Sequence, residues 1–371
     1  MLTSHPTLLI GPSDWQPDVM PREEFARRLD ALWRSAPGAS RAIVYGDPRH
    51  HAELAYLTNL VPKLEAAVAL ISRSGAPLMF VGGGPNMLTA SQPLTWIADV
   101  LPLRDMGKAI AKWLAESGGG GTVLIGSGYM QSALRKNVAE AVGDGAQDAT
   151  ALPWTLMARK SPHELAAIRE ACAALRAAVT AIGDAKRSGA SVTTAILAGE
   201  RAANAAGAQD VRTLFSVNGG RTLAPFETLI DQKSEPLQVY VAVRKFNYWA
   251  EGFAMFAERP QHAASMPIDV LRLARSAIRA GTRASDVAQL AEAAIRPLRW
   301  HPVTAGAFAG AVGLALDEPP YTNASGSFAA GEVYSLRIGV TDGSEQHAIA
   351  SAMIAVRDDD NELLWSMEHA P

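Results

Sequence analysis

The hydrophobic positions in the first part of the chain form short runs that alternate with a segment of helical period. Four apolar runs bounded by glycine, serine or proline are typical of strands in a covered sheet: 41–46, 66–72, 77–82 and 122–126. Residues 21–36 have apolar positions three and four apart, which predicts a helix. Strands and helices that alternate in this way predict an α/β domain, which we extend over residues 1–153.

A second unit begins with a helix start signal. Ser161 and Glu164 have the spacing of a capping box, and Pro162 takes the first helical position. Farther on, segments 186–207 and 278–298 resemble each other, each with a basic residue, a glycine two positions later and a Ser/Thr-capped helix. Because both are followed by β-rich sequence, we predict an α+β domain of two related halves over 154–371.

Strand patterns dominate the rest of this unit. Residues 238–259 read as a hairpin, with Tyr240 in its first strand and the single carboxylate Glu251 in its second. Further strands are predicted at the end of the chain, over 332–340, 347–356 and 362–367. The acidic run at 357–362 lacks the spacing of a calcium loop and is interpreted as a solvated turn.

Composition narrows the class of protein. The chain has 371 residues, of which 48% are hydrophobic and 19% charged, so it can bury a large core and is long enough for two domains. Its net charge of -3 argues against nucleic acid as a partner. Cys172 is the one cysteine, which excludes a disulfide framework and fits a reducing cytoplasm. The N-terminus has no signal-peptide pattern and the longest apolar window is shorter than a membrane span, so we expect a soluble cytoplasmic protein without a membrane partner.

Three motifs carry a resemblance to a known family. The segments "RKSPHELAAIREA", "GLALDEPPY" and "FAAGEVYSLRIGV" resemble the linker helix and two glycine-rich stretches of creatinase, aminopeptidase P and prolidase. The resemblance implies the pita-bread fold, with an internal pseudo-twofold duplication, over 154–371, preceded by a creatinase-like α/β domain over 1–153.

The resemblance also locates the metal-binding positions of the family. Its peptidases hold two divalent metals with two Asp, one His and two Glu, and the matching positions here are Tyr240, Glu251, Gly310, Arg337 and about Ala350. Among these residues Glu251 alone is a carboxylate, and an arginine at a ligand position repels a dication. We therefore expect no metal and no other cofactor.

Three of these residues are candidates for catalysis. Glu251 would act as a general base, Arg337 would grip a substrate carboxylate, and Tyr240 would donate a proton or a hydrogen bond. The structural alternative is equally open: Glu251 and Arg337 form a buried ion pair, and Tyr240 is a packed aromatic that fills the volume of the metals.

Six further residues are candidates for substrate binding: Arg221, Phe226, Arg244, Asp317, Glu318 and Glu65. Phe226 and Asp317 match two histidines of the family, and Glu318 matches a glutamate that is more often structural. Glu65 matches a loop that reaches into the partner's active site in creatinase-like dimers, so a homodimer is expected. For each of these six residues a solvated or packed side chain is the alternative.

Three hypotheses about function remain. The first is a metal-independent, creatinase-like enzyme that hydrolyses a C–N bond, or acts as a lyase, on a small molecule with amine and carboxylate groups. The second is a non-catalytic pseudo-peptidase that binds a peptide, a small molecule or a protein. The third is an Xaa-Pro peptidase whose metal ligands are not recognised. The polar residues Tyr240, Glu251 and Arg337 favour the first, because polar groups are costly to bury without use.

Overall fold

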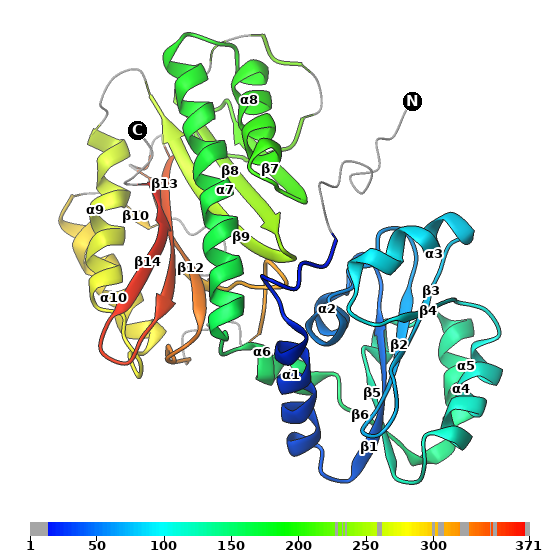
Figure 1. Cartoon of the computed structure of the whole chain (residues 1–371). Helices are drawn as coiled ribbons and strands as arrows, with labels where there is room; N and C mark the ends of the chain where they lie inside the picture. The colour runs from blue at the N-terminus through cyan, green and yellow to red at the C-terminus, as the bar shows by residue number, and fades with distance from the viewer. Residues whose placement is uncertain are drawn as a thin grey trace. The chain divides into compact units, whose positions relative to one another are not determined.

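The structure is a computed structural model, and it describes residues 14–367 apart from 227–228, 232, 234–235, 258–261, 299–300, 303–307, 320–325, 342 and 344–346. The described residues form two compact units, 14–157 and 158–367 (Figure 1). The predicted boundary at 153 falls inside helix α6 (Ala151–Met157). Within α6, Trp154 donates a 2.8 Å hydrogen bond to Glu53 of the first unit. The whole of α6 therefore belongs to the first unit, which ends at Met157.

The first unit is built on a six-stranded mixed sheet in the order β4-β3-β2-β1-β5-β6. Its strands are β1 (Ala39–Gly46), β2 (Ala67–Ser72), β3 (Leu78–Val81), β4 (Asp99–Pro102), β5 (Gly121–Ile125) and β6 (Ala146–Asp148). The four predicted strands are β1, β2, β3 and β5. The other two were not predicted, because β4 has one buried residue and β6 has none, so neither shows the apolar run of a covered strand.

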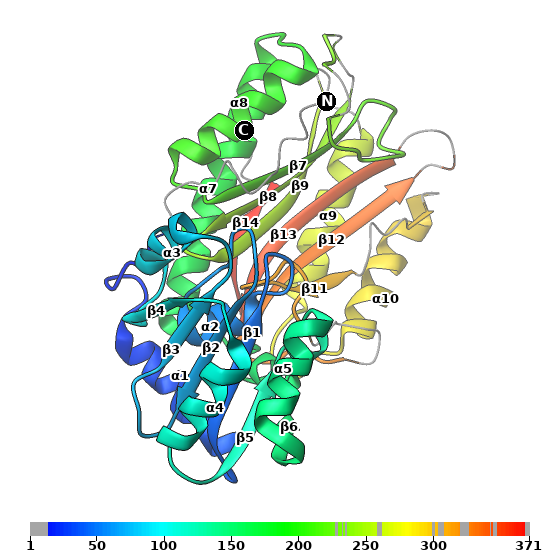
Figure 2. The ribbon, with the colours of Figure 1, turned by 90° about the vertical axis from the view of Figure 1, so that its right-hand side faces the viewer.

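Helices pack on this sheet in two groups. One group is α1 (Arg22–Ser35), α2 (Ala52–Thr58) and α6, which contact one another. The other is α4 (Met106–Glu116) and α5 (Ser132–Val142), which lie side by side (Figure 2). The remaining helical segments are α3 (Pro85–Ser91) and the short 3-10 turns Gln92–Leu94, Ser127–Tyr129 and Gly143–Gly145. Ile43 of β1 and Trp113 of α4 belong to the apolar core of this unit.

The second unit opens with the predicted capped helix. Helix α7 (Pro162–Arg187) starts with a complete capping box: Glu164 N donates to Ser161 Oγ at 3.2 Å, and Ser161 N donates to Glu164 Oε2 at 2.9 Å. Helix α8 (Val192–Ala205) packs on α7, and Ser191 caps its N-terminus.

A three-stranded antiparallel sheet lies against α7, in the order β7-β8-β9 (Figure 1). Its strands are β7 (Asp210–Ser216), β8 (Leu237–Lys245) and β9 (Tyr248–Phe256). The predicted hairpin is β8 and β9, joined by Phe246 and Asn247, whose φ angles are 51° and 68°. Two consecutive residues with positive φ match the twist of a two-residue hairpin turn.

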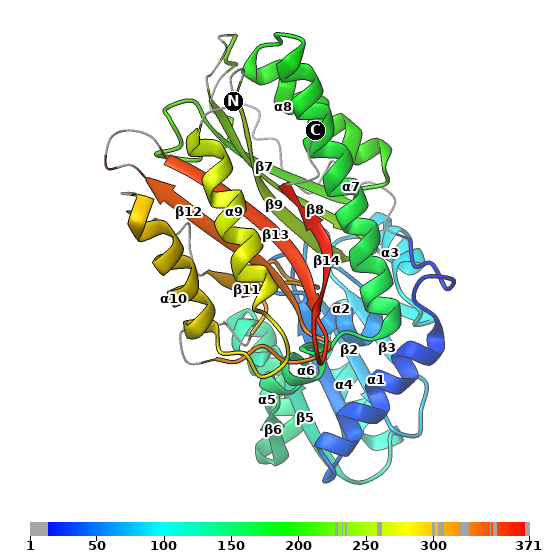
Figure 3. The ribbon, with the colours of Figure 1, turned by 90° about the vertical axis from the view of Figure 1, so that its left-hand side faces the viewer.

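A second sheet follows in the order β10-β12-β13-β14, with β11 also paired to β12. Its strands are β10 (His301–Pro302), β11 (Ala309–Ala311), β12 (Val333–Thr341), β13 (His347–Val356) and β14 (Asn361–Ser366). Helix α9 (His262–Ser276) covers β12 and β13, and α10 (Ala284–Ile295), which continues into a 3-10 turn at Arg296–Leu298, packs on α9 (Figure 3).

The two sheets meet along β9 and β13. Phe253 N donates to Ser351 Oγ at 2.6 Å, and Glu251 N donates to Met353 Sδ at 3.2 Å. Gly252 is required here, because a Cβ atom would lie 2.3 Å from the ring of Trp365 in β14. This close packing places side chains of β9 beside those of β12. Within the described residues, no helix combines the length and apolarity needed to cross a bilayer.

Candidate functional site

The candidate site is centred on Glu251, in the middle of β9. Its neighbours along the strand are apolar or glycine, and Glu251 itself is 1% exposed. Across the hairpin it faces Ala242, whose small side chain leaves room for longer residues on either side to reach the carboxylate. A carboxylate at this depth requires hydrogen-bonding or charged partners.

Tyr240 is the first partner. It lies diagonally across the β8–β9 pair from Glu251, and its hydroxyl donates a 2.6 Å hydrogen bond to Glu251 Oε2. Burial raises the pKa of Tyr240 well above its ordinary value, and the charge and hydrogen bond of Glu251 raise that pKa further. The hydroxyl therefore remains protonated near neutral pH and acts as a hydrogen-bond donor.

Arg337 is the second partner and comes from β12 in the other sheet. Its Nη2 donates to Glu251 Oε1. Gly310 of β11 lies near the guanidinium, and a Cβ atom there would be 3.9 Å from Nη2, so the space beside the guanidinium is not filled by a side chain at that position. The Nε atom of Arg337 is buried and has no hydrogen-bond partner in the part of the chain that the structure describes. The structure thus brings together Tyr240, Glu251 and Arg337 around one buried carboxylate.

A second group of charges lies on the same face of the three-stranded sheet. The register places Arg212 of β7 beside Ala242, so that Arg212 and Glu251 flank this alanine. The guanidinium groups of Arg212 and Arg244 lie 4.5 and 5.3 Å from the ring centroid of Trp249. We call Asp210, Arg212, Arg244 and Trp249 the Arg–Trp cluster.

The Arg–Trp cluster is cationic. Asp210 is its one carboxylate, 3.4 Å from Arg212 and 3.8 Å from Arg244. Burial lowers the pKa of Arg244 to about 10, helped by the charge of Arg212 and opposed by Asp210, so this guanidinium stays charged near neutral pH. Sequence reasoning missed Arg212 and Trp249. Alternation along β7 and β9 places both on the face of Glu251, but only the register of the sheet shows that they are neighbours.

The other predicted substrate-binding residues of this unit lie elsewhere. Arg221 is exposed in the loop after β7, and Phe226 is half-buried with its ring 4.9 Å from that of Phe215. Asp317 is exposed, whereas its neighbour Glu318 is 1% exposed. The hydrogen bonds, ion pairs and ring contacts described for these four residues do not involve Tyr240, Glu251 or Arg337.

Glu318 has a structural environment. It forms an ion pair with Lys160, and its Oε1 accepts a 2.5 Å hydrogen bond from Leu314 N. A Cβ atom at Gly313 would lie 2.4 Å from the same oxygen, so glycine is required for this packing. Both carboxylate oxygens are therefore engaged within the protein, in agreement with the structural role that the resemblance made more common for this position.

Glu65 belongs to the first unit, in the loop between α2 and β2. It is exposed and lines a cavity of that unit. Its expected role in a partner subunit's site remains a prediction.

The positions that match metal ligands do not fit a divalent cation. Arg337 bonds directly to Glu251, so a dication held by that carboxylate would lie beside a guanidinium. In the strand register Ser351 faces Arg337, while Ala350 faces Ile338, and neither residue supplies a carboxylate. Across the described ranges, no group of three or more His, Cys, Asp or Glu side chains is placed to hold a metal ion.

Comparison with known proteins identifies the fold. No protein-family model matches the chain, and no curated protein sequence matches it either. Solved structures do match. An X-Pro aminopeptidase from Thermotoga maritima has a TM-score of 0.74 and 13% identity, over 91% of this chain and 96% of that chain. A variant of aminopeptidase P from Escherichia coli has a TM-score of 0.76 and 14% identity, over 94% and 96% of the two chains.

A third match is the prolidase from Pyrococcus horikoshii, with a TM-score of 0.71, 13% identity, and coverage of 92% of this chain and 97% of that chain. These matches confirm, at the level of fold, the resemblance that the sequence motifs carried. Over nearly its whole length, the chain has the mixed α/β fold of the aminopeptidase P and prolidase structures.

Proposed function

We propose that the second unit is a metal-independent, creatinase-like enzyme that acts on a small molecule bearing an amine and a carboxylate. The reaction would be hydrolysis of a C–N bond or a lyase step. The observation that carries this proposal is the arrangement around Glu251: a buried carboxylate in contact with an arginine whose Nε has no partner among the described residues.

Arg337 would anchor the substrate. A buried N–H without a partner costs free energy, and an acceptor supplied by a ligand removes that cost. A guanidinium has five N–H donors in a planar fork, so Arg337 can keep Glu251 on one side and bind a carboxylate with the donors that remain. The Arg–Trp cluster adds positive charge on the same face and favours an anionic ligand.

Glu251 would be the general base. In hydrolysis it would take a proton from water, whose oxygen adds to the carbon of the C–N bond, and the leaving nitrogen would receive that proton as the bond breaks. In a lyase step it would take a proton from the carbon next to the C–N bond; the C–H electrons would form a C=C bond as the C–N bond breaks, and the leaving amine would receive the proton. Tyr240 stays protonated, and once Glu251 has taken up a proton, the hydroxyl of Tyr240 would turn from Glu251 and donate to a substrate oxygen that develops negative charge.

The second hypothesis, a non-catalytic pseudo-peptidase, is favoured by a different observation. Both oxygens of Glu251 already have protein partners, and the side chain is 1% exposed. This arrangement is also what a structural ion pair requires. The third hypothesis is an Xaa-Pro peptidase, the activity named for matching structures from Thermotoga maritima and Bacillus anthracis. The residues described above do not fit the two metals that the sequence resemblance implies for such a peptidase.

We further propose that the second unit consists of two related halves. In support, each half has a helix pair, α7 with α8 and α9 with α10, that packs against antiparallel strands. The similar segments 186–207 and 278–298 contain α8 and α10, the second helix of each pair. We also propose a cytoplasmic homodimer, supported by the sequence resemblance and by the single cysteine.

Turnover and binding by the full chain test the enzymatic proposal. The protein is screened against N-substituted amino acids and their amides, with release of amine or ammonia as one readout and calorimetric binding as the other. We expect Glu251→Gln to lower kcat by about 10²- to 10⁴-fold with binding retained. We expect Arg337→Lys to weaken binding of the carboxylates by about tenfold, with little effect on the amides.

The control is Arg169→Gln, which changes an exposed arginine of α7. Binding without turnover of any compound would support the pseudo-peptidase. Turnover that is unchanged in Glu251→Gln would overturn the assignment of the base.

A further inference from the structure

The first unit contains a cavity of about 410 Å³ that the proposed function does not use. It lies where β3 and β4 end, since Val81 and Pro102 are the last residues of these strands and both line it. The two strands are parallel, so their carboxyl ends meet at one edge of the sheet. This edge is where open α/β sheets bind ligands, and the volume is in the range of small-molecule sites.

Two opposite charges line this cavity, Glu65 and Arg104. Neither side chain forms a hydrogen bond or ion pair with any residue that the structure describes, including each other. Many of the chain's exposed charges have a partner of opposite sign nearby, as Lys112 has in Glu116. A carboxylate and a guanidinium that share a cavity but remain separate offer one position for an ammonium group and another for a carboxylate.

The position of Glu65 depends on the glycine loop after β3. A Cβ atom at Gly82 would lie 2.7 Å from both Glu65 Cβ and Glu65 Oε2, so the glutamate folds across this glycine. The next two glycines line the cavity, and Gly83 has a φ of 88°. The amides of Gly83 and Gly84 donate no hydrogen bond within the described part of the chain, which leaves donors for an anionic or carbonyl group.

The rest of the cavity wall is apolar. It consists of Val81, Pro85, Leu88, Pro102 and Leu103. These side chains would cover an aliphatic group, while the charged groups of the ligand bind Glu65 and Arg104. The combination of two separate charges and an apolar wall is the chemistry that recognises an α-amino acid with an apolar side chain.

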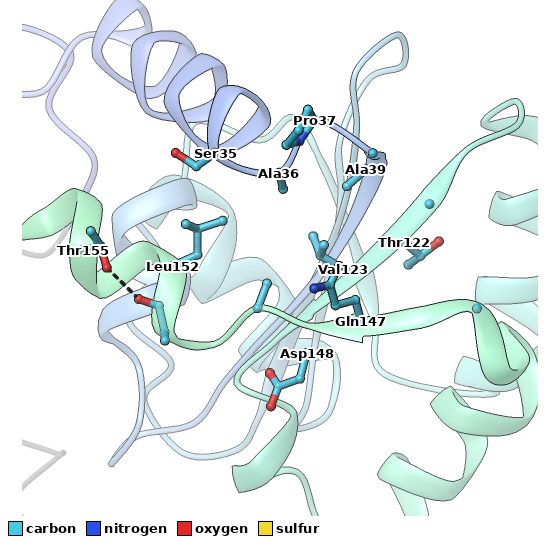
Figure 4. A pocket seen from close by; sticks show the side chains of 15 residues that line it. Ser35, Ala36, Pro37, Ala39, Thr122, Val123, Gln147, Asp148, Leu152 and Thr155 are labelled. Carbon is cyan, nitrogen blue, oxygen red and sulfur yellow. Dashed lines mark hydrogen bonds between the residues drawn. The ribbon is translucent and has the colours of Figure 1, made fainter.

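Another cavity of this unit lacks this combination. It has a volume of about 540 Å³ and lies at the amino ends of β1, β5 and β6, with Ala39 and Gly121 among its lining residues (Figure 4). Asp148, which also lines it, accepts hydrogen bonds from the amide and the hydroxyl of Thr150, at 3.0 and 2.7 Å. Its carboxylate is therefore already bonded within the protein.

We propose that the cavity at the ends of β3 and β4 binds a zwitterionic ligand, a free amino acid or a dipeptide with an apolar side chain. Glu65 binds the ammonium group, and Arg104, with the loop amides, binds the carboxylate. The site contains neither Glu251 nor Arg337, and it uses Glu65 within its own unit in place of the role in a partner subunit's site that the resemblance implies.

Calorimetric titration of the full chain with leucine and with leucyl-leucine tests this site. We expect one of the two to bind with a stoichiometry of one per chain, and which one binds gives the length of the ligand. Leucinamide, which lacks the carboxylate, and 4-methylpentanoate, which lacks the ammonium group, should bind about tenfold more weakly or not at all. Failure of leucine and leucyl-leucine to bind at millimolar concentration would overturn the proposal.

Variants assign the binding to this cavity. Glu65→Gln and Arg104→Gln should each weaken binding by about tenfold. Gly82→Ala should do the same, because its Cβ displaces Glu65. The matched controls Glu116→Gln and Arg135→Gln alter exposed charges of α4 and α5 and should leave the affinity unchanged.

A last variant separates this site from the one in the second unit. Binding to the cavity should persist in Arg337→Lys. If affinity falls in Arg337→Lys and is retained in Arg104→Gln, the ligand binds in the second unit and the cavity proposal is wrong.

Discussion

At the scale of single residues, the proposed site of the second unit is built around one buried carboxylate and its two partners. Glu251 accepts hydrogen bonds from Tyr240 on its own sheet and from Arg337 on the other sheet. The tyrosine is neutral and the arginine is charged, so the two partners stabilise the carboxylate in different ways. Substitution of Tyr240 should therefore change how stability depends on pH, whereas substitution of Arg337 should change the free energy of unfolding itself.

The pKa of Tyr240 predicts how stability changes at high pH. This pKa is raised above its ordinary value of 10.0, so the unfolded chain loses the phenol proton first as the pH rises. The folded state then binds more protons than the unfolded state, and the free energy of unfolding falls above about pH 10, by up to ~1.4 kcal/mol per pH unit for this group. Urea unfolding of wild type and Tyr240→Phe over this range should show the shallower pH dependence in the variant. Parallel curves would contradict the prediction.

Loss of Arg337 should be costly because it leaves Glu251 buried without its cation. We expect Arg337→Met to lower the free energy of unfolding by about 3 kcal/mol. The double variant Glu251→Gln/Arg337→Met removes the charge as well and should recover much of this loss, as measured by urea unfolding. A cost of Arg337→Met well below ~1 kcal/mol, the range of exposed pairs, would show that the pair is not buried as described.

At the scale of elements, the capping box at the start of α7 is the strongest local signal in the sequence, and the structure contains it in full. The capping box of α7 is complete, and Glu164 does more than cap the helix, because it also accepts a 3.0 Å hydrogen bond from the hydroxyl of Tyr248. Tyr248 is the first residue of β9. The start of α7 is thus linked to the strand that carries Glu251.

This link predicts that loss of the N-cap of α7 lowers the free energy of unfolding more than loss of the N-cap of α8. Ser161→Ala removes a buried cap at α7 and should cost about 1–2 kcal/mol of unfolding free energy. Ser191→Ala removes the exposed cap of α8, where the structure shows no reciprocal glutamate, and should cost about 0.5–1 kcal/mol. Thermal or urea unfolding of both variants measures the difference. A larger loss from Ser191→Ala would contradict the role of the capping box.

At the scale of the whole molecule, the fold matches the aminopeptidase P and prolidase structures, while the residues at the positions that the resemblance assigns to metal ligands differ from those of the family. A tyrosine, a glycine and an arginine stand at positions where the family has an aspartate, a histidine and a glutamate: Tyr240, Gly310 and Arg337. These replacements fit one another, since the guanidinium lies near Gly310 and bonds to Glu251. We expect the guanidinium of Arg337 to supply the positive charge that metal ions supply at these positions in the family.

This exchange predicts that the chain does not respond to divalent metals. Manganese or cobalt added to the full-length protein should leave its Tm within about 2 °C of the value in a chelator, because the guanidinium of Arg337 repels a dication at this position. Elemental analysis of the purified protein gives an independent measure. A saturable rise in Tm, with two metal ions per chain, would contradict the prediction and support a peptidase.

Whether a feature of the structure could be predicted from the sequence depends on how far apart in the chain the contacting residues are. The capping box, the β8–β9 hairpin and most strands were predictable because they rest on contacts between residues close in the chain. The strands β4, β6, β7, β10 and β11 were missed, because none of them has an uninterrupted buried apolar run that a local pattern reveals. The family resemblance, confirmed as a fold, pointed to Tyr240, Glu251 and Arg337, which the structure brings together.

The sequence by itself determined the capped helix α7, the β8–β9 hairpin and the apolar faces of most strands, because these are local properties of the chain. Only the tertiary structure decided which side chains share a site. It paired Glu251 with a residue 86 positions away and Glu318 with one 158 positions away. It also placed Arg212 beside Trp249, and Glu65 in one cavity with Arg104. Such contacts follow from strand register and sheet packing, which no local pattern of hydrophobic and polar residues encodes.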